Sequence, residues 1–368
     1  MRWAGFWFLL LVSGAHSLAI RPRVLFLDAA SLAGAERLNQ EGYDSQTLKV
    51  SDDDLDAMLS SKDSPPTIVI VSSSNTIRAS TASSPALVAV GRAGVGVDNI
   101  DLDACNAAGV PVFNAPMASA NAVAELTITL ILALSRRLTE SKASLDQGQW
   151  KRREMVGRTV KGKTLAIIGR GRIGRAVGEL ARALGLKVVS LRRKDGDSEE
   201  GMELLEDLDS LLKAADFLSV HVPLTAQTRG LIGARELALL RSSASVINTA
   251  RAEVVDDAAL LDALNRGGLS GAAVDVWTAE GEKTSADGST KVWAAFDEPV
   301  LRSLASHPLV VATPHLGAST LECAEQIQLD IGECCMDLCE GRVPATIVGS
   351  DTDTDAALGS AWTKLGIS

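Results

Sequence analysis

Three polar side chains, an arginine, a carboxylate and a histidine, each follow a short apolar run in the second half of the chain. They are Arg251, Asp275 and His315. If the runs are parallel strands, their carboxyl ends meet at one edge of a sheet, where ligands bind. An arginine there can anchor a substrate, a histidine can exchange a proton, and a carboxylate favours the protonated histidine. Arg251 could instead pair with Asp256 and Asp257.

Only one of the four histidines combines a strand end with a glycine-containing loop, and it is His315. His16 lies in a leader-like segment, and His307 precedes a proline in an expected surface loop. His221 ends a strand beside the expected cofactor cleft, and we expect it to shape that cleft rather than to transfer protons. His315 is therefore the candidate general acid or base.

A glycine-rich turn joins an expected strand to an expected helix. Gly169, Gly171 and Gly174 fit the pattern GxGxxG, with Arg172 and Ile173 before the last glycine. Glycines at these positions allow a tight turn and let backbone N–H groups approach a pyrophosphate at the helix N-terminus. Because a strand precedes the turn and a helix follows it, the segment predicts dinucleotide binding.

The strand that follows this turn ends in Arg192, Arg193 and Lys194, where an acidic residue usually binds the ribose hydroxyls. Cations here would bind a 2′-phosphate, which predicts that NADP is favoured over NAD. A solvated basic turn is the alternative interpretation. Asp195 and Asp197 follow closely and could turn inward if the strand ends later.

Short apolar runs alternate with helical segments, which is typical of parallel α/β sheets. We predict an α/β protein of two doubly wound parallel-sheet domains, with a Rossmann-type nucleotide-binding domain (117–315) inserted in a discontinuous, flavodoxin-like substrate domain (22–116 and 316–350). We expect residues 351–368 to form a polar, poorly ordered tail. The expected strands cover 24–27, 67–71, 87–90, 164–168, 188–191, 217–220, 245–248, 271–274 and 309–312.

Charge and cysteine content limit the partners of the chain. A net charge of −10 and a pI near 5.0 argue against nucleic acid or an anionic membrane, because both are polyanions. We therefore expect a small-molecule partner. Five cysteines, four of them within 323–339, lack the spacing of a disulfide framework or a metal site, and we expect no metal.

Residues 1–19 resemble a cleavable signal peptide, since Arg2 precedes an apolar stretch that small residues follow. The stretch is too short to span a bilayer. We expect entry into the secretory route or an organelle. If the segment is a misassigned start or a disordered extension, the protein would be cytoplasmic.

Eight motifs, in order over nearly all of residues 23–348, resemble the D-isomer-specific 2-hydroxyacid dehydrogenases, most of all the D-3-phosphoglycerate dehydrogenases. Together they are highly specific. They are GRAGVGVDNIDLDAC from residue 91, VFNAP from 112, NAVAELTI from 121, GKTLAIIGRGRIGR from 162, HVPLTAQTRGLI from 221, VINTAR from 246, GAAVDVW from 271 and TPHLGAST from 313.

The resemblance implies a role for each matching residue. Arg251 would hold the substrate carboxylate and carbonyl, His315 would exchange the proton on the substrate oxygen, and a glutamate would partner His315. Hydride would pass to or from the nicotinamide without a metal. The implied substrate-binding residues are Arg92, Ala93, Gly94 and Val95. In addition to the glycine turn and the arginines that follow it, the implied cofactor-binding residues are Pro223, Ala250 and Asp275.

Two departures from the family pattern concern this site. Ala252 and Glu253 follow Arg251 where the family usually has two glycines. The family's glutamate normally comes five residues after the aspartate and precedes a proline: Glu280 has the spacing, whereas Glu298 has the proline. We favour Glu280, because spacing from a rigid strand fixes direction better. A surface insertion, expected at 281–291, separates the two glutamates.

The resemblance implies a homodimer, with residues 150–160 resembling a wrapping arm. The leading function is a phosphoglycerate dehydrogenase-like enzyme of serine biosynthesis. An NADP-dependent hydroxypyruvate or glyoxylate reductase is the alternative, and Arg192 favours it. Ser72 also favours it, because phosphoglycerate dehydrogenases tend to have an arginine at that position. Arg78 could take the place of that arginine. A third hypothesis, from another class, is a nucleotide-sensing interaction protein similar to the family's transcriptional corepressors.

Overall fold

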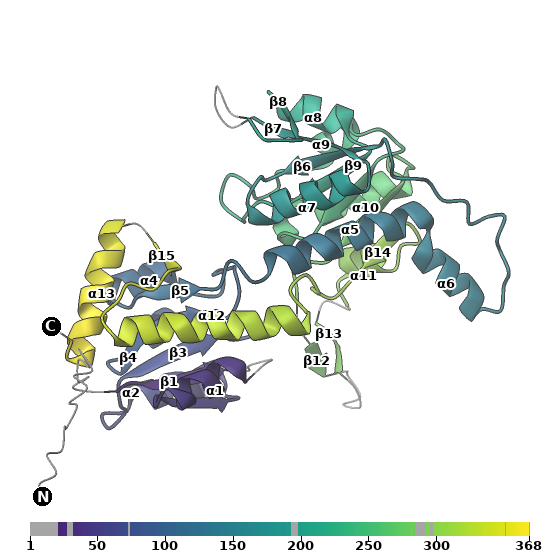
Figure 1. Ribbon diagram of the computed structural model, residues 1–368. Helices are drawn as coiled ribbons and strands as arrows, with labels where there is room; N and C mark the ends of the chain where they lie inside the picture. Colours follow the sequence, from purple (N-terminus) through teal and green to yellow (C-terminus); the bar gives the residue numbers. More distant parts are fainter. Residues whose placement is uncertain are drawn as a thin grey trace, which may run out of the picture. The chain divides into compact units, whose positions relative to one another are not determined.

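A computed structural model describes residues 21–27, 32–72, 74–192, 198–280, 282–284, 291–294, 297–349 and 351–367. The leader-like residues 1–19 and Arg193 lie outside this part of the chain. The chain divides into two compact units, unit 1 (Met1–Ala115 and Glu325–Ser368) and unit 2 (Pro116–Ala324) (Figure 1). Each unit is built on its own sheet, in which all or nearly all pairs are parallel.

Among the described residues, unit 1 has a six-stranded sheet in the order β15-β5-β4-β3-β1-β2. All pairs are parallel except that of β15 with β5. The central strand β3 has the sequence TIVIV and is buried at every position, as expected of a strand covered on both faces. The strands are β1 (Arg23–Leu27), β2 (Asp44–Leu48), β3 (Thr67–Val71), β4 (Leu87–Arg92), β5 (Val112–Asn114) and β15 (Ile347–Val348).

Helices cover both faces of this sheet. One apolar cluster joins the strands to α2, α3 and α4. Elsewhere in unit 1, α1 and α12 approach so closely that a Cβ at Gly34 would lie 2.4 Å from the carbonyl oxygen of Gln328. The helices are α1 (Ala33–Gln40), α2 (Asp52–Ser60), α3 (Ala79–Ala82), α4 (Leu102–Ala107), α12 (Leu321–Cys339) and α13 (Asp351–Leu365).

Unit 2 has a seven-stranded sheet in the order β14-β11-β10-β9-β6-β7-β8, and all its pairs are parallel. The strand order reverses between β6 and β9, which is the place where doubly wound sheets bind ligands. The strands are β6 (Thr164–Ile168), β7 (Lys187–Leu191), β8 (Glu203–Leu205), β9 (Phe217–Val220), β10 (Ser245–Asn248), β11 (Gly271–Val274) and β14 (Val310–Ala312). The predicted class, an α/β protein with two doubly wound parallel sheets, is confirmed.

Two apolar clusters cover the faces of the unit 2 sheet, one with α5 and α7 and the other with α8 to α11. A short antiparallel hairpin, β12 (Glu282–Thr284) with β13 (Lys291–Trp293), lies apart from the sheet. The helices are α5 (Ala120–Arg136), α6 (Leu138–Asp146), α7 (Arg172–Ala183), α8 (Leu208–Ala214), α9 (Ala234–Leu239), α10 (Asp257–Asn265) and α11 (Pro299–Ala305).

The ends of the two units differ from the expected boundaries at one place. The chain enters unit 2 at Pro116, next to the expected residue 117. It returns to unit 1 at Glu325 rather than at 316, because α12 runs without interruption from Leu321 to Cys339 and the division falls inside it.

The expectation of a poorly ordered tail after residue 350 is wrong. Residues 351–365 form α13, whose buried positions Ala357, Leu358, Ala361 and Leu365 recur at helical spacing. The helix contacts β4 and α4. Two of the four buried residues are alanines, whose small side chains indicate a buried helix face only weakly. Polar residues lie between them, so the sequence indicated a polar tail rather than a packed helix.

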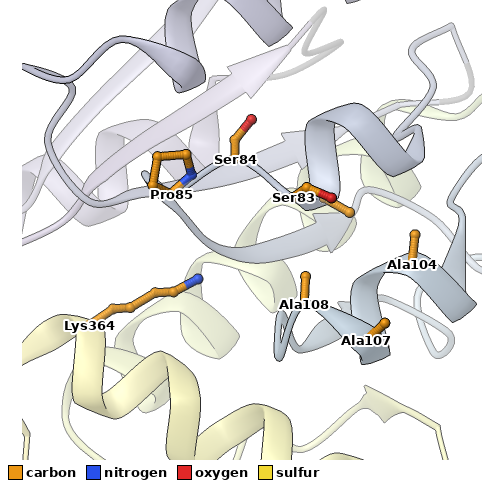
Figure 2. Close-up of a pocket in the computed structure, with 8 residues that line it drawn as sticks. Ser83, Ser84, Pro85, Ala104, Ala107, Ala108 and Lys364 are labelled. Atoms are coloured by element: carbon orange, nitrogen blue, oxygen red, sulfur yellow. The ribbon is translucent and has the colours of Figure 1, made fainter.

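A shallow pocket of about 450 Å³ lies where α13 meets the ends of α3 and α4 (Figure 2). Lys364 reaches into it from α13 and donates a hydrogen bond to the carbonyl oxygen of Leu87 at 2.8 Å. Burial lowers the pKa of this ammonium. The other lining residues are alanine, serine and proline, so Lys364 is the one ionisable side chain among the described residues of this pocket.

We expect the change Leu358→Ala to lower the free energy of local opening of α13 by about 2–5 kcal/mol, since Leu358 is 1% exposed. Native-state hydrogen exchange of the α13 amides measures this opening. The control Thr363→Ala, on the exposed face of the same helix, should change it by less than about 0.5 kcal/mol. Equal effects of the two changes would show that α13 is not packed as described.

Candidate active site

The glycine turn between β6 and α7 has the geometry of a dinucleotide-binding turn. Gly169 has φ +101°, and a Cβ there would lie 2.4 Å from the carbonyl oxygen of His221. A Cβ at Gly174 would lie 2.0 Å from the carbonyl oxygen of Gly169. Gly171, the N-cap of α7, has open space where its Cβ would stand. The three glycines thus serve the turn, the strand–helix packing and the approach of a phosphate.

His221 supports this turn from the neighbouring strand β9. Its backbone N–H donates to the carbonyl oxygen of Ile168 at 2.7 Å, and its Nε2 lies 2.8 Å from Ser219 Oγ. Burial lowers the pKa of the imidazole to about 4, so it is neutral at physiological pH. Pro223 follows it at the start of a loop, where its carbonyl oxygen accepts a hydrogen bond from Thr228 Oγ1 at 2.6 Å.

Arg192 follows β7 directly, and its Nε donates to Glu206 Oε1 at 2.7 Å. A second carboxylate, which sequence analysis missed, stands nearby. Glu199 Oε2 lies 3.2 Å from Arg170 NH1 and 3.1 Å from Arg175 NH2. Arg170 belongs to the glycine turn and is buried, with its Nε donating to the carbonyl oxygen of the last residue of β7. Three arginines, Arg170, Arg175 and Arg192, and the carboxylates of Glu199 and Glu206 therefore lie around the glycine turn and the end of β7.

The loop after β14 that carries His315 is fixed by Asp275 at the end of β11. Asp275 Oδ1 accepts hydrogen bonds from Thr313 Oγ1 at 2.6 Å and from the Leu316 N–H at 2.7 Å. Its Oδ2 accepts one from the Gly317 N–H at 2.9 Å. The backbone N–H of His315 donates to the Asp275 carbonyl oxygen at 2.8 Å, and His315 has φ +55°. Asp275 thus shapes the loop directly.

Glu280 is the glutamate beside His315. Its Oε2 lies 2.7 Å from His315 Nδ1, and its Oε1 accepts a hydrogen bond from the Trp277 N–H at 3.2 Å. Burial acts to raise the pKa of the Glu280 carboxyl, but the bond to His315, that residue's charge, the Trp277 N–H and Arg251 together hold it below its usual value. Glu298 instead caps α11 by accepting the N–H of Leu301 at 2.7 Å.

Arg251 follows β10 and lies close enough to Glu280 to help lower the pKa of its carboxyl. Its NH1 donates to the carbonyl oxygen of Ala250 at 2.7 Å. The backbone carbonyl of Arg251 accepts a hydrogen bond from Asn248 Nδ2 at 2.9 Å. The carboxyl ends of neighbouring strands β10, β11 and β14 thus bear Arg251, Asp275 and the His315 loop.

The departure from two glycines after Arg251 is accommodated by a short 3-10 helix, Ala252–Val254. Ala252 is buried, and Glu253 pairs with Arg229 at 3.6 Å. The backbone N–H of Gly230 donates to the Glu253 carbonyl oxygen at 2.7 Å. Of these contacts, only the pairing with Arg229 depends on the Glu253 side chain, and Arg251 lies at the strand end.

The expected substrate-binding segment, Arg92 to Val95, belongs to unit 1 and begins at the last residue of β4. Ala93 donates its N–H to the Val71 carbonyl oxygen at 2.8 Å. Gly94 has φ +147°, and a Cβ there would lie 2.4 Å from Arg92 NH1. The loop thus depends on glycine at this position.

Arg78, which could replace the arginine missing at Ser72, is engaged within unit 1. Its NH1 lies 2.7 Å from Asp53 Oδ1 and its NH2 lies 3.3 Å from Asp52 Oδ2. Its side chain therefore faces two acidic residues of α2.

In the part of the chain that the structure describes, no group of three or more histidine, cysteine, aspartate and glutamate side chains is arranged to hold a metal ion. The five cysteines are buried as free thiols. Among the described residues, no helix has both the length and the apolar character needed to cross a membrane.

Comparison with known proteins identifies the relatives of this chain. Residues 128–317 match the family model described as D-isomer specific 2-hydroxyacid dehydrogenase, NAD binding domain. A D-3-phosphoglycerate dehydrogenase from Methanocaldococcus jannaschii is 38% identical over 276 residues, which cover 74% of this chain and 49% of that protein. A hydroxypyruvate reductase from Thermotoga maritima is 36% identical over 244 residues, 66% of this chain and 75% of that protein.

Among solved structures, a protein from Thermus thermophilus has a TM-score of 0.76 and 30% identity, covering 89% of this chain and all of its own. The chain spans about half the length of the first curated relatives it matches. The matched family model spans more than half of this chain, including the glycine turn, Arg251, Glu280 and His315. The chain therefore belongs to the D-isomer specific 2-hydroxyacid dehydrogenase family.

Proposed function

We propose that the protein is an oxidoreductase that transfers a hydride between NAD(P) and a small D-2-hydroxy acid or 2-oxo acid. The observation that carries the proposal is the 2.7 Å contact between His315 Nδ1 and Glu280 Oε2, in the same unit as the glycine turn. It supplies an acid–base pair beside Arg251, a cation suited to a carboxylate. The bound dinucleotide would accept or supply the hydride at its nicotinamide.

Each residue has one task in this proposal. Arg251 anchors the substrate carboxylate through its guanidinium. Glu280 holds His315 through Nδ1, which leaves Nε2 to take the alcohol proton during oxidation or to return it during reduction. Gly171 and the N-terminus of α7 hold the pyrophosphate.

Two substrate classes have separate support. The similarity to D-3-phosphoglycerate dehydrogenases supports a phosphorylated substrate and a role in serine biosynthesis. The pairing of Arg78 with Asp52 and Asp53 favours an unphosphorylated substrate, as in a hydroxypyruvate or glyoxylate reductase. The two carboxylates offset the positive charge of Arg78 that a substrate phosphate would need. Turnover of 3-phosphohydroxypyruvate, hydroxypyruvate and glyoxylate with both cofactors separates them. No turnover of any would favour a nucleotide-sensing interaction protein.

Removing the candidate general acid tests the proton route. We expect His315→Ala to lower kcat by roughly 10²-fold or more, the scale of general acid–base catalysis, and to leave the dissociation constant for the dinucleotide nearly unchanged. Steady-state kinetics and calorimetric titration measure the two quantities. An active His315→Ala enzyme would refute the route.

The glutamate is tested by the pH dependence of reduction. Reduction needs protonated His315, and a neighbouring carboxylate favours that form, so activity should fall as pH rises. In Glu280→Gln the support is lost, and the fall should occur at lower pH. The control Glu298→Gln removes the charge of a helix cap and should affect stability without moving the pH profile. A shift in Glu298→Gln alone would assign the role to Glu298.

We propose that NADP is preferred over NAD, supported by Arg192 at the end of β7 in place of a carboxylate. Charge-assisted hydrogen bonds contribute about 1.5–3 kcal/mol each, which corresponds to roughly ten- to a hundredfold discrimination. Arg192→Asp should therefore move the ratio of kcat/KM values toward NAD by at least tenfold. Glu206→Gln, which removes the negative charge beside Arg192 but keeps the cation, should not. An NAD preference in the wild type would contradict the proposal.

We also propose a homodimer and entry into the secretory route or an organelle. The exposure of Trp150 and Val156 supports a second copy packing on the expected arm. Light scattering of the intact chain tests the proposed homodimer.

Sequencing of the mature N-terminus after cell fractionation tests the proposed entry into the secretory route or an organelle.

A further inference from the structure

The insertion between Glu280 and Glu298 returns to the place where it begins. Its strands β12 and β13 pair antiparallel, with Glu282 opposite Trp293 (Figure 1). Trp293 therefore comes back to the chain segment that carries Glu280. The insertion is expected to be a surface element, and through Trp293 it contacts the segment that carries Glu280.

Trp293 makes two contacts at this point. Its indole Nε1 donates to the carbonyl oxygen of Ala279 at 2.8 Å, one residue before Glu280. Its ring meets that of Trp277 edge to face, with centroids 4.9 Å apart and an interplanar angle of 67°. The hydrogen bond fixes the backbone next to Glu280, and the ring contact packs Trp293 against Trp277, a residue of the apolar core.

Trp277 connects these contacts to the His315 loop. It is buried, and its indole Nε1 donates to the carbonyl oxygen of Thr313 at 2.9 Å. Its backbone N–H donates to Glu280 Oε1 at 3.2 Å. The two tryptophans thus link the Glu280 segment with the loop that carries His315.

We propose that Trp293 is a positioning residue that clamps Glu280 against His315, so that the insertion helps to set the acid–base pair. The side chains of His315 and Glu280 are 43% and 37% exposed, and an ion pair this exposed gains little energy of its own. Its geometry must come from the surrounding structure. The groups that face Glu280 are His315, the Trp277 N–H and the charge of Arg251. The inference rests on the proposed role of Glu280 and His315 in proton exchange.

We expect Trp293→Ala to lower kcat for reduction roughly tenfold, the scale of one lost hydrogen bond and one lost aromatic pair. The pH at which reduction falls should move down, in the direction of Glu280→Gln, while the dissociation constant for the dinucleotide stays unchanged. Trp293→Phe, which keeps a ring but loses the N–H, should show a smaller change in the same direction. It also serves if the alanine variant does not fold.

A double-mutant cycle separates positioning from general destabilisation. If Trp293 acts through Glu280, Trp293→Ala should have little further effect on rate or pH profile in a Glu280→Gln background. The matched control is Trp362→Phe in unit 1, whose indole Nε1 also donates to a backbone carbonyl, that of Leu338, at 3.1 Å. It should leave the pH profile of reduction in place.

The outcomes distinguish this inference from the proposed function. Trp293 variants that leave the pH profile in place, or whose effects add to that of Glu280→Gln, would overturn the clamp while the proton route stands. If His315→Ala and Glu280→Gln are themselves without effect, the proposed function fails and the clamp fails with it. A shared, non-additive shift supports the clamp.

Discussion

The buried carboxylate of Asp275 is the constraint on which the candidate site depends. It is 1% exposed, and a charge so deeply buried must be compensated by hydrogen bonds. Thr313, Leu316 and Gly317 supply three donors from one loop. These bonds hold His315, the residue between them, in a left-handed conformation that non-glycine residues rarely adopt. The position of His315, the candidate acid, therefore follows from the need to supply hydrogen bonds to the buried Asp275 carboxylate.

Unit 2 brings a glycine turn and this loop to the carboxyl ends of one parallel sheet, so the proposed hydride and proton transfers share a single rigid support. Glu280 completes the arrangement from the segment that leaves the same strand as Asp275. Trp277 binds the loop and the Glu280 segment together through its indole and its backbone. The residues after Arg251 and the insertion after Glu280 both make contacts near these strand ends, through Glu253 with Arg229 and through Trp293 with Ala279.

Sequence patterns indicated Arg251 and His315 because parallel strands bring their ends together. The resemblance to the family implied a glutamate partner for His315, and spacing from a rigid strand favoured Glu280 over Glu298. The contacts of Glu199 with two arginines and of Trp293 with Ala279 were not predicted. Glu199 lies outside the named helices and strands, and Trp293 ends a short strand of the insertion. The path of both segments depends on tertiary contacts rather than on periodicity. The apolar stripe of α13 was missed because alanine marks a buried face only weakly.

The transfer of deuterium tests the central claim most directly. The protein would be incubated with a 2-oxo acid and NADPH or NADH deuterated at nicotinamide C4, and the product analysed by mass spectrometry and chiral chromatography. The account predicts a 2-hydroxy acid of D configuration that carries deuterium from one face of the cofactor at C2, formed by the wild type and far more slowly by His315→Ala. A product of L configuration, or deuterium lost to solvent, would contradict it.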